Sequence, residues 1–124
     1  MEMSANILRH AWCRETAHPS YQKDWTEDNP GYGQCAVTAL LINDLCFAPI
    51  YRCKVGRQTH YFNMWARRHE VIDFTSEQFG DMKIDYSDCE SVSREQLLKC
   101  KHVKERYQML KARWENYYES IQNT

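Results

Sequence analysis

The sequence lacks the long apolar segment that would carry it into or across a membrane. Its longest uncharged apolar run is far shorter than the ~20 residues that a membrane-spanning helix needs. The first residues also lack the apolar centre of a secretion signal, because Arg9, His10 and Arg14 interrupt them. We therefore expect a cytoplasmic protein with no membrane partner.

An excess of charge of one sign is also missing. The chain has 16 Lys and Arg residues against 17 Asp and Glu residues, which gives a formal net charge of −1. Proteins that bind nucleic acid usually carry a basic excess, so we expect no nucleic-acid partner. With 124 residues, of which 43% are hydrophobic, the chain is long enough to bury its own core. We predict a single domain over residues 1–124.

The six cysteines show none of the close pairs that hold zinc. The sequence contains no C-x-x-C and no H-x-x-x-H, and its nearest spacings, His10-x-x-Cys13 and Cys100-x-His102, both fit on a helix. We therefore expect no metal and no cofactor. A cytoplasmic chain of this length does not need disulfides, so we expect reduced thiols.

The apolar pattern predicts a central helix followed by a small group of strands. Residues 34–46 are apolar on nearly every face, which is typical of a helix buried in the centre of a domain. Pro49 prevents this helix from continuing. Segments with alternating, aromatic or β-branched residues predict three strands, at 50–55, 59–66 and 69–74.

Both ends of the chain have helical spacing. Residues 4 to about 17 predict one helix, and the capping box Ser93-x-x-Gln96 opens a long helical stretch. A second box, Thr75-x-x-Gln78, predicts a short helical turn, and residues 80–92 are acidic and irregular. As one helix, the stripe from Cys100 to Ile121 would be about 33 Å long. Either it breaks or crosses the whole domain, or its end pairs with a second copy in a homodimer.

The order of three residues suggests nucleophilic chemistry. Cys35 follows a glycine-rich turn at the start of the central helix, His60 lies in the second strand, and Asp73 lies in the third. A helix start favours a thiolate, because its free N–H groups and dipole favour negative charge. A histidine can take the thiol proton, and a carboxylate can orient the imidazole.

The hairpin geometry tests whether His60 and Asp73 can meet. If an even-numbered loop joins strands 59–66 and 69–74, the numbers of paired residues add up to 135. His60 and Asp73 are then diagonal neighbours on one face of the sheet, within reach of long side chains. An odd-numbered loop would put them on opposite faces.

Each of these residues also has a structural interpretation. A single helix cysteine is usually a core residue, and we interpret Cys46, Cys53 and Cys100 in that way. Cys35 differs from them because it stands at a helix start. Its backbone N–H would bind the oxyanion, together with the side-chain amide of Asn29 or Gln34.

Five motifs resemble the bacterial YunG-like family, and the resemblance extends from about residue 21 to residue 113. They are Asn29-Pro30-x-x-Gly33-Gln34-Cys35-Ala36-Val37-Thr38-Ala39-Leu40, His60-Tyr61-Phe62-Asn63, Ile72-Asp73-Phe74-Thr75-x-x-Gln78-Phe79, Ser93-Arg94-Glu95-x-Leu97-Leu98 and Arg106-Tyr107-x-x-Leu110. The order of Cys, His and Asp is also similar, more distantly, to papain-like and transglutaminase-like cysteine hydrolases. That resemblance implies Cys35 as nucleophile, His60 as base and Asp73 as orienting acid. Papain-like enzymes often have a glutamine six residues before the cysteine, where this chain has Asn29.

The combined expectation is an α+β protein of papain-like, or transglutaminase-like, arrangement. A central helix packs on a small antiparallel sheet, and N- and C-terminal helices flank it. The expected function is that of a cysteine hydrolase or acyltransferase acting on an amide, ester or thioester. The alternative is a non-catalytic binding or interaction module that retains the same fold. The sequence does not identify the substrate.

Overall fold

The structure, a computed structural model, describes residues 5–123. Four antiparallel strands form one sheet in the order β3-β2-β1-β4. Their bounds are β1 Ile50–Val55, β2 Gln58–Trp65, β3 Glu70–Ile72 and β4 Cys89–Val92. The α-helices are α1 Ala5–Ala11, α2 Cys35–Cys46, α3 Arg94–Leu98 and α4 Lys101–Gln122. Short 3-10 helices are η1 Arg14–Thr16, η2 Pro19–Asp24, η3 Ala66–Arg68 and η4 Ser76–Phe79. This arrangement confirms a mixed α+β fold with a small antiparallel sheet.

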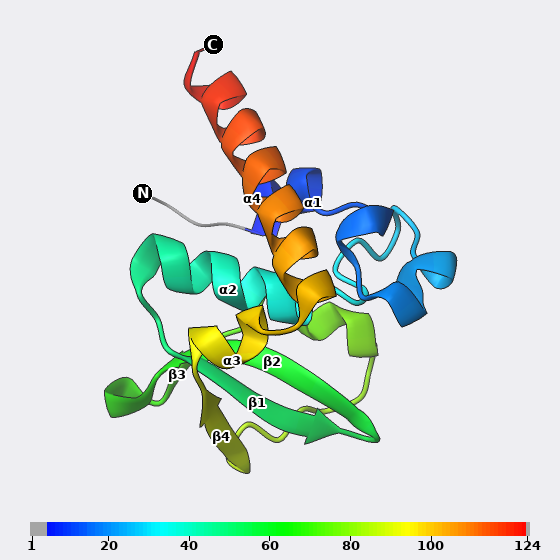
Figure 1. The fold of residues 1–124 in the computed structure, drawn as a ribbon. Coiled ribbons are helices and arrows are strands. Elements are labelled where there is room, and N and C mark those ends of the chain that lie inside the picture. The colour runs from blue at the N-terminus through cyan, green and yellow to red at the C-terminus, as the bar shows by residue number, and fades with distance from the viewer. Residues whose placement is uncertain (1–4, 124) are drawn as a thin grey trace.

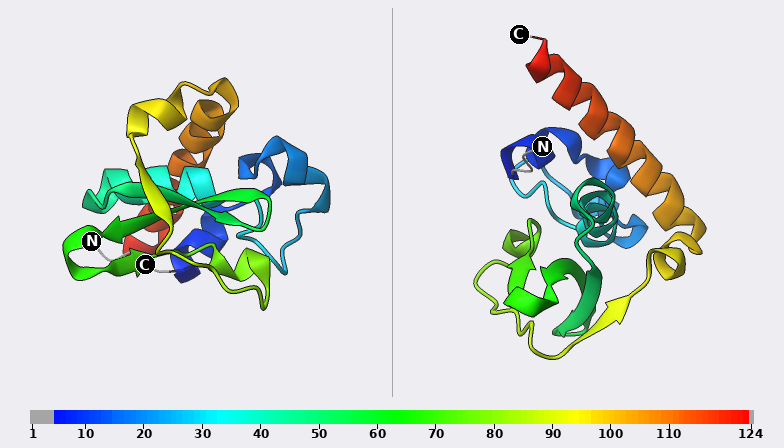
Figure 2. Two further views of the ribbon diagram at one scale, coloured as in Figure 1. Left: turned by 90° about the horizontal axis from the view of Figure 1, so that it is seen from below. Right: turned by 90° about the vertical axis from the view of Figure 1, so that its left-hand side faces the viewer.

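Helix α2 occupies the centre of the molecule. Seen end-on in Figure 2 (right), it lies between the sheet and the pair of helices α1 and α4. Every residue from Ala36 to Ile42 is buried, because the helix has apolar side chains on all of its faces. It ends at Cys46, and the next residue, Phe47, has a left-handed backbone (φ 64°) two residues before Pro49. The prediction of a central helix over 34–46 is therefore confirmed.

Apolar clusters cover both faces of the sheet. The larger cluster joins α1, α2 and α4 to one face and includes Leu8, Leu40 and Leu110, all fully buried. The smaller cluster, around Phe62, lies on the other face and is closed by the segment that leads to β4. The sheet is thus an internal layer, and a polar side chain on either face needs a partner.

The hairpin between β2 and β3 has the predicted register. In each of its pairs, such as Asn63↔Ile72 and Met64↔Val71, the residue numbers add up to 135. The connection is the 3-10 turn η3 followed by His69, whose backbone is left-handed (φ 49°). Residues 66–69 are an even number, so His60 and Asp73 lie on the same side of the hairpin, as predicted.

Two elements are shorter than predicted because side chains bind the local backbone. The predicted helix over 4–17 ends at Ala11, and Thr16 Oγ1 then both accepts from Cys13 N (3.0 Å) and donates to Cys13 O (2.9 Å). Residue 4 lies outside the described residues. Strand β3 ends at Ile72 rather than 74, because Asp73 Oδ1 accepts from Thr75 N (3.1 Å) and forms a turn.

Several other details differ from the prediction. Strand β4 lies within 80–92, where we expected only irregular structure; it is a short edge strand paired with β1.

The two predicted capping boxes have different outcomes. Thr75 does not cap the turn η4, whereas Ser93 and Gln96 do form the predicted capping box. Cys46 and Cys100 are exposed rather than buried, since one ends α2 and the other precedes α4.

The C-terminal helical stretch breaks in two at residues 99–100, and α4 then crosses the molecule. Its buried residues extend as far as Trp114. Farther along, Tyr118 stacks on Trp114 and Tyr117 stacks on His10, at ring-centroid distances of 5.0 and 4.3 Å. The last turns project beyond the other elements (Figure 1). A homodimer through this end of α4 stays a prediction.

None of the helices within residues 5–123 combines the length and the apolar character that a membrane span requires.

Candidate active site

Cys35 is the first residue of α2, and the turn before it fixes its position. Gly33 has φ 74°, and a Cβ atom there would lie 3.0 Å from the ring of Tyr21, so only glycine fits. The Gly33 N–H donates to Gln78 Oε1 (3.1 Å), which ties the turn to η4. Cys35 is half-buried and lines a cavity of about 360 Å³. Its thiol is therefore both held in place and reachable.

His60 and Asp73 form a buried pair. The distance between His60 Nε2 and Asp73 Oδ2 is 2.6 Å, and the two side chains are 0% and 4% exposed. Tyr86 donates its hydroxyl to the same carboxylate oxygen (2.6 Å). The second oxygen, Oδ1, accepts from the backbone N–H and the hydroxyl of Thr75. These contacts hold the Asp73 carboxylate in one orientation, and the carboxylate in turn orients the imidazole.

The pair favours a charged carboxylate and a protonated imidazole. Burial alone would raise the pKa of Asp73, but hydrogen bonds from His60 and Tyr86 hold that pKa below its ordinary value. Burial alone would lower the pKa of His60, but Asp73 and Cys35 outweigh it and raise the pKa to about 9. Burial and the nearby Asp73 charge raise the pKa of Tyr86, so its hydroxyl remains a donor.

The other nitrogen of the imidazole, Nδ1, is the one that Asp73 leaves available. Because Nε2 is bound to Asp73, Nδ1 is the atom left for an interaction with the Cys35 thiol, which contributes to the raised pKa of His60. Nδ1 is buried and has no partner at standard hydrogen-bond geometry among the described residues. The interaction with Cys35 therefore lacks hydrogen-bond geometry in this structure, and catalytic hydrogen bonds often form fully only when substrate is bound.

The two proposed oxyanion side chains differ in position. Gln34, the residue before α2, is fully buried, and its Nε2 donates to Cys13 O (2.9 Å). Asn29 lines a separate small cavity beside Trp12 and not the cavity of Cys35. The backbone N–H of Cys35 lies in the first turn of α2, where amides have no intrahelical acceptor. Of the three candidate donors, it is the one that belongs to a residue lining the cavity of Cys35.

The chain matches the family model described as "YunG protein" over residues 1–119. It belongs to the YunG family. It is also 35% identical over 121 residues to "Uncharacterized protein YunG" of Bacillus subtilis (strain 168). The aligned residues cover 98% of this chain and 96% of that protein. No solved structure matches the chain significantly. The resemblance to the YunG-like family is therefore confirmed.

The structure adds side chains around the candidate triad of this YunG-family protein that the sequence did not predict. Tyr86 lies in the stretch 80–92, where no periodic pattern marks it. The sequence suggests Thr75 and Gln78 as a capping pair for a helical turn. In the structure, Thr75 instead binds Asp73, and Gln78 binds Gly33. Arg106, which lines the cavity of Cys35, did carry a signal, because it lies on the apolar stripe of the C-terminal helix.

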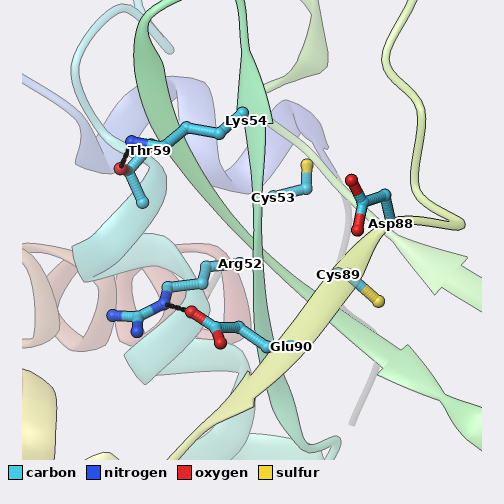
Figure 3. A pocket seen from close by; sticks show the side chains of 7 residues that line it. All are labelled: Arg52, Cys53, Lys54, Thr59, Asp88, Cys89 and Glu90. Atoms are coloured by element: carbon cyan, nitrogen blue, oxygen red, sulfur yellow. Dashed lines mark hydrogen bonds and ion pairs between the residues drawn. The ribbon is translucent and has the colours of Figure 1, made fainter.

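A larger pocket, of about 560 Å³, lies at strands β1 and β4 (Figure 3). Its polar side chains bind one another: Arg52 pairs with Glu90, and Lys54 donates to Thr59 Oγ1 (2.9 Å). No member of the Cys35–His60–Asp73 triad lines it. Two polar pairs in it are already formed and it contains no residue of the candidate triad, so the smaller cavity at Cys35 is the better candidate site. In the described part of the chain, no three His, Cys, Asp or Glu side chains gather as a metal site would require.

The raised pKa of His60 predicts that stability falls at alkaline pH. Its pKa rises from 6.5 to about 9 on folding, so the stabilisation is complete below about pH 6.5 and is lost as the pH rises through 9. Between these pH values, we expect the free energy of unfolding to decrease by about 3 kcal/mol from this group. Urea titrations at several pH values would measure the slope. In Asp73→Asn the slope should be flatter, and equal slopes would contradict the prediction.

Proposed function

We propose that this YunG-family protein is a cysteine hydrolase or acyltransferase that acts on an amide, ester or thioester. The observation that carries the proposal is the 2.6 Å contact between His60 Nε2 and Asp73 Oδ2, and an interaction with Cys35 contributes to the raised pKa of the same imidazole. A nucleophile at a helix start, a base and an orienting carboxylate are the parts that acyl transfer requires.

The proposed reaction has two steps. Cys35 Sγ attacks the carbonyl carbon, and the oxyanion of the tetrahedral intermediate is bound by the Cys35 N–H. The C–N, C–O or C–S bond then breaks as His60 gives the Nδ1 proton to the leaving group, which leaves an acyl thioester on Cys35. Water or another nucleophile next loses a proton to His60 and attacks the thioester, which frees the thiolate.

The fold supports a papain-like arrangement as part of the same proposal. Papain-like enzymes also place the nucleophile at the start of a central helix and the histidine on an antiparallel sheet. In this chain, α2 packs against β2, which carries His60, and Asp73 directly follows the neighbouring strand β3. The proposal therefore assigns the N-terminal end of α2 and one end of the β2–β3 hairpin to the active centre.

Alkylation rates test the proposal without knowledge of the substrate. Cys46 and Cys100 are exposed, whereas Cys35 is half-buried, so accessibility alone would make Cys35 the slower of the three. With limiting iodoacetamide at pH 7, we expect Cys35 to react at least about tenfold faster than either. Peptide mass spectrometry would give each rate. If Cys35 reacts no faster than Cys46, the chain is instead the non-catalytic binding module.

A further inference from the structure

The cavity beside Cys35 contains a buried cation without an acidic partner. Arg106, on α4, is only 5% exposed. Its Nη1 donates to Thr16 O (3.0 Å), its Nε is buried without a partner, and no carboxylate of the described residues lies within ion-pair distance of it. Its side chain lines the same cavity as Cys35.

An unpaired buried guanidinium is costly, which makes this arrangement unusual for a purely structural residue. Burial lowers the pKa of Arg106, while the nearby Cys35 offsets part of this effect. Arg94 shows the ordinary solution in the same protein: it is less buried, and it pairs with Asp44 at 2.9 Å. The single backbone carbonyl that Arg106 binds does not neutralise its charge as a carboxylate would. The remaining N–H donors of the Arg106 guanidinium are free for a ligand.

The rest of the cavity also favours an anion. No Asp or Glu lines it. His18 and His102 contact each other there at a ring-centroid distance of 5.2 Å. Burial and the Arg106 charge lower the pKa of both histidines, so they are neutral at pH 7 and add hydrogen-bonding capacity without a second permanent charge. The Nδ1 atom of His102 is buried and has no partner among the described residues.

We propose that this cavity binds a carboxylate group of the substrate through Arg106, so that the substrate is a small acyl compound with a free carboxylate. The proposal rests on the proposed function, because it places the reacting carbonyl at Cys35. A guanidinium matches the two oxygens of a carboxylate, and a single permanent cation matches a single negative charge. A volume of about 360 Å³ suits a small molecule rather than a folded partner.

Two alkylating reagents of similar size distinguish anion binding by Arg106 from the intrinsic reactivity of the Cys35 thiol. Iodoacetate carries a carboxylate and iodoacetamide does not, so their rate ratio at Cys35 reports anion binding. The ratio at exposed Cys46 in the same molecule corrects for intrinsic reactivity. In wild type we expect the corrected ratio to favour iodoacetate, and in Arg106→Gln to fall about tenfold. Arg106→Lys should retain part of the preference.

Arg113→Gln is the matched control. Arg113 is also on α4 and donates to one backbone carbonyl, that of Ala11, but it lines a different cavity. Its replacement should leave the ratio unchanged. If Arg106→Gln slows both reagents equally, Arg106 acts only on the thiolate and the anion site is wrong. If Cys35 reacts slowly with iodoacetamide itself, the proposed function fails instead, and the two failures are therefore distinct.

Protection of the wild-type protein provides a test that does not depend on a variant folding. We expect N-acetylglycine to slow the labelling of Cys35 by iodoacetamide, and N-acetylglycinamide to have no such effect at the same concentration. Equal protection by the acid and the amide would overturn the proposal. Stronger protection by inorganic phosphate than by the acid would overturn the choice of a carboxylate.

Discussion

Replacement of His60 by alanine is expected to slow the alkylation of Cys35 at pH 7 by about 10²-fold or more. The imidazole of His60 is the base that we propose for the thiol, and its Nε2 lies 2.6 Å from Asp73 Oδ2. Without it, the groups left to favour a thiolate are the start of α2 and the Arg106 guanidinium in the same cavity. Rates with iodoacetamide, followed by peptide mass spectrometry, would measure the loss.

His60 is also a core residue, so its replacement needs controls. It is fully buried, and its ring lies 4.9 Å from that of Phe79, so circular dichroism must show that the variant is folded at the assay temperature. The labelling of exposed Cys46 in the same molecule should not change. His69→Asn is the matched control, because His69 is exposed and asparagine tolerates its left-handed backbone. An unchanged Cys35 rate in folded His60→Ala would contradict the assignment of His60 as the base.

Replacement of Leu40 by alanine is expected to destabilise the protein by about 2–5 kcal/mol, whereas Cys35→Ala should cost less than about 1.5 kcal/mol. Leu40 is fully buried in the middle of α2, between the sheet and α4, and its loss leaves a cavity. Cys35 is half-buried at the end of the same helix and faces an existing cavity. Urea denaturation at pH 6 would measure both values.

The comparison decides whether Cys35 is a site residue or a core residue. Met109→Ala provides an exposed apolar control, since Met109 is 42% exposed on α4, and its effect should be within about 0.5 kcal/mol. A loss in Cys35→Ala as large as that in Leu40→Ala would show that the thiol is packed in the core. That result would favour the structural interpretation of Cys35 over the catalytic one.

The elements that the sequence predicted well are those with a strong local pattern. Helix α2 is apolar on nearly every face, and in β1 the residues Tyr51, Cys53 and Val55 alternate with Arg52 and Lys54, so the pattern of side chains alone predicts both elements. The register of the β2–β3 hairpin followed from parity, because side chains alternate between the faces of a strand. This register was enough to bring His60 and Asp73 to the same side.

The misjudged elements depend on contacts between distant segments. Strand β4 is four residues long and exists because it pairs with β1, so its own residues carry little signal. Tyr86 reaches Asp73 only because the segment before β4 folds back over the sheet. Asn29 has the spacing of an oxyanion donor, yet the turns that follow it direct it toward Trp12 rather than Cys35.

The sequence by itself determined the YunG family, the central helix, the hairpin register and the three residues of the candidate triad. Only the tertiary structure decided which groups surround that triad: Tyr86 and Thr75 on the carboxylate, and an unpaired Arg106 in the cavity of the thiol. The reason is physical. Periodicity reports which face of a helix or strand is apolar, but the partner of a buried polar group comes from whichever distant segment packs against it.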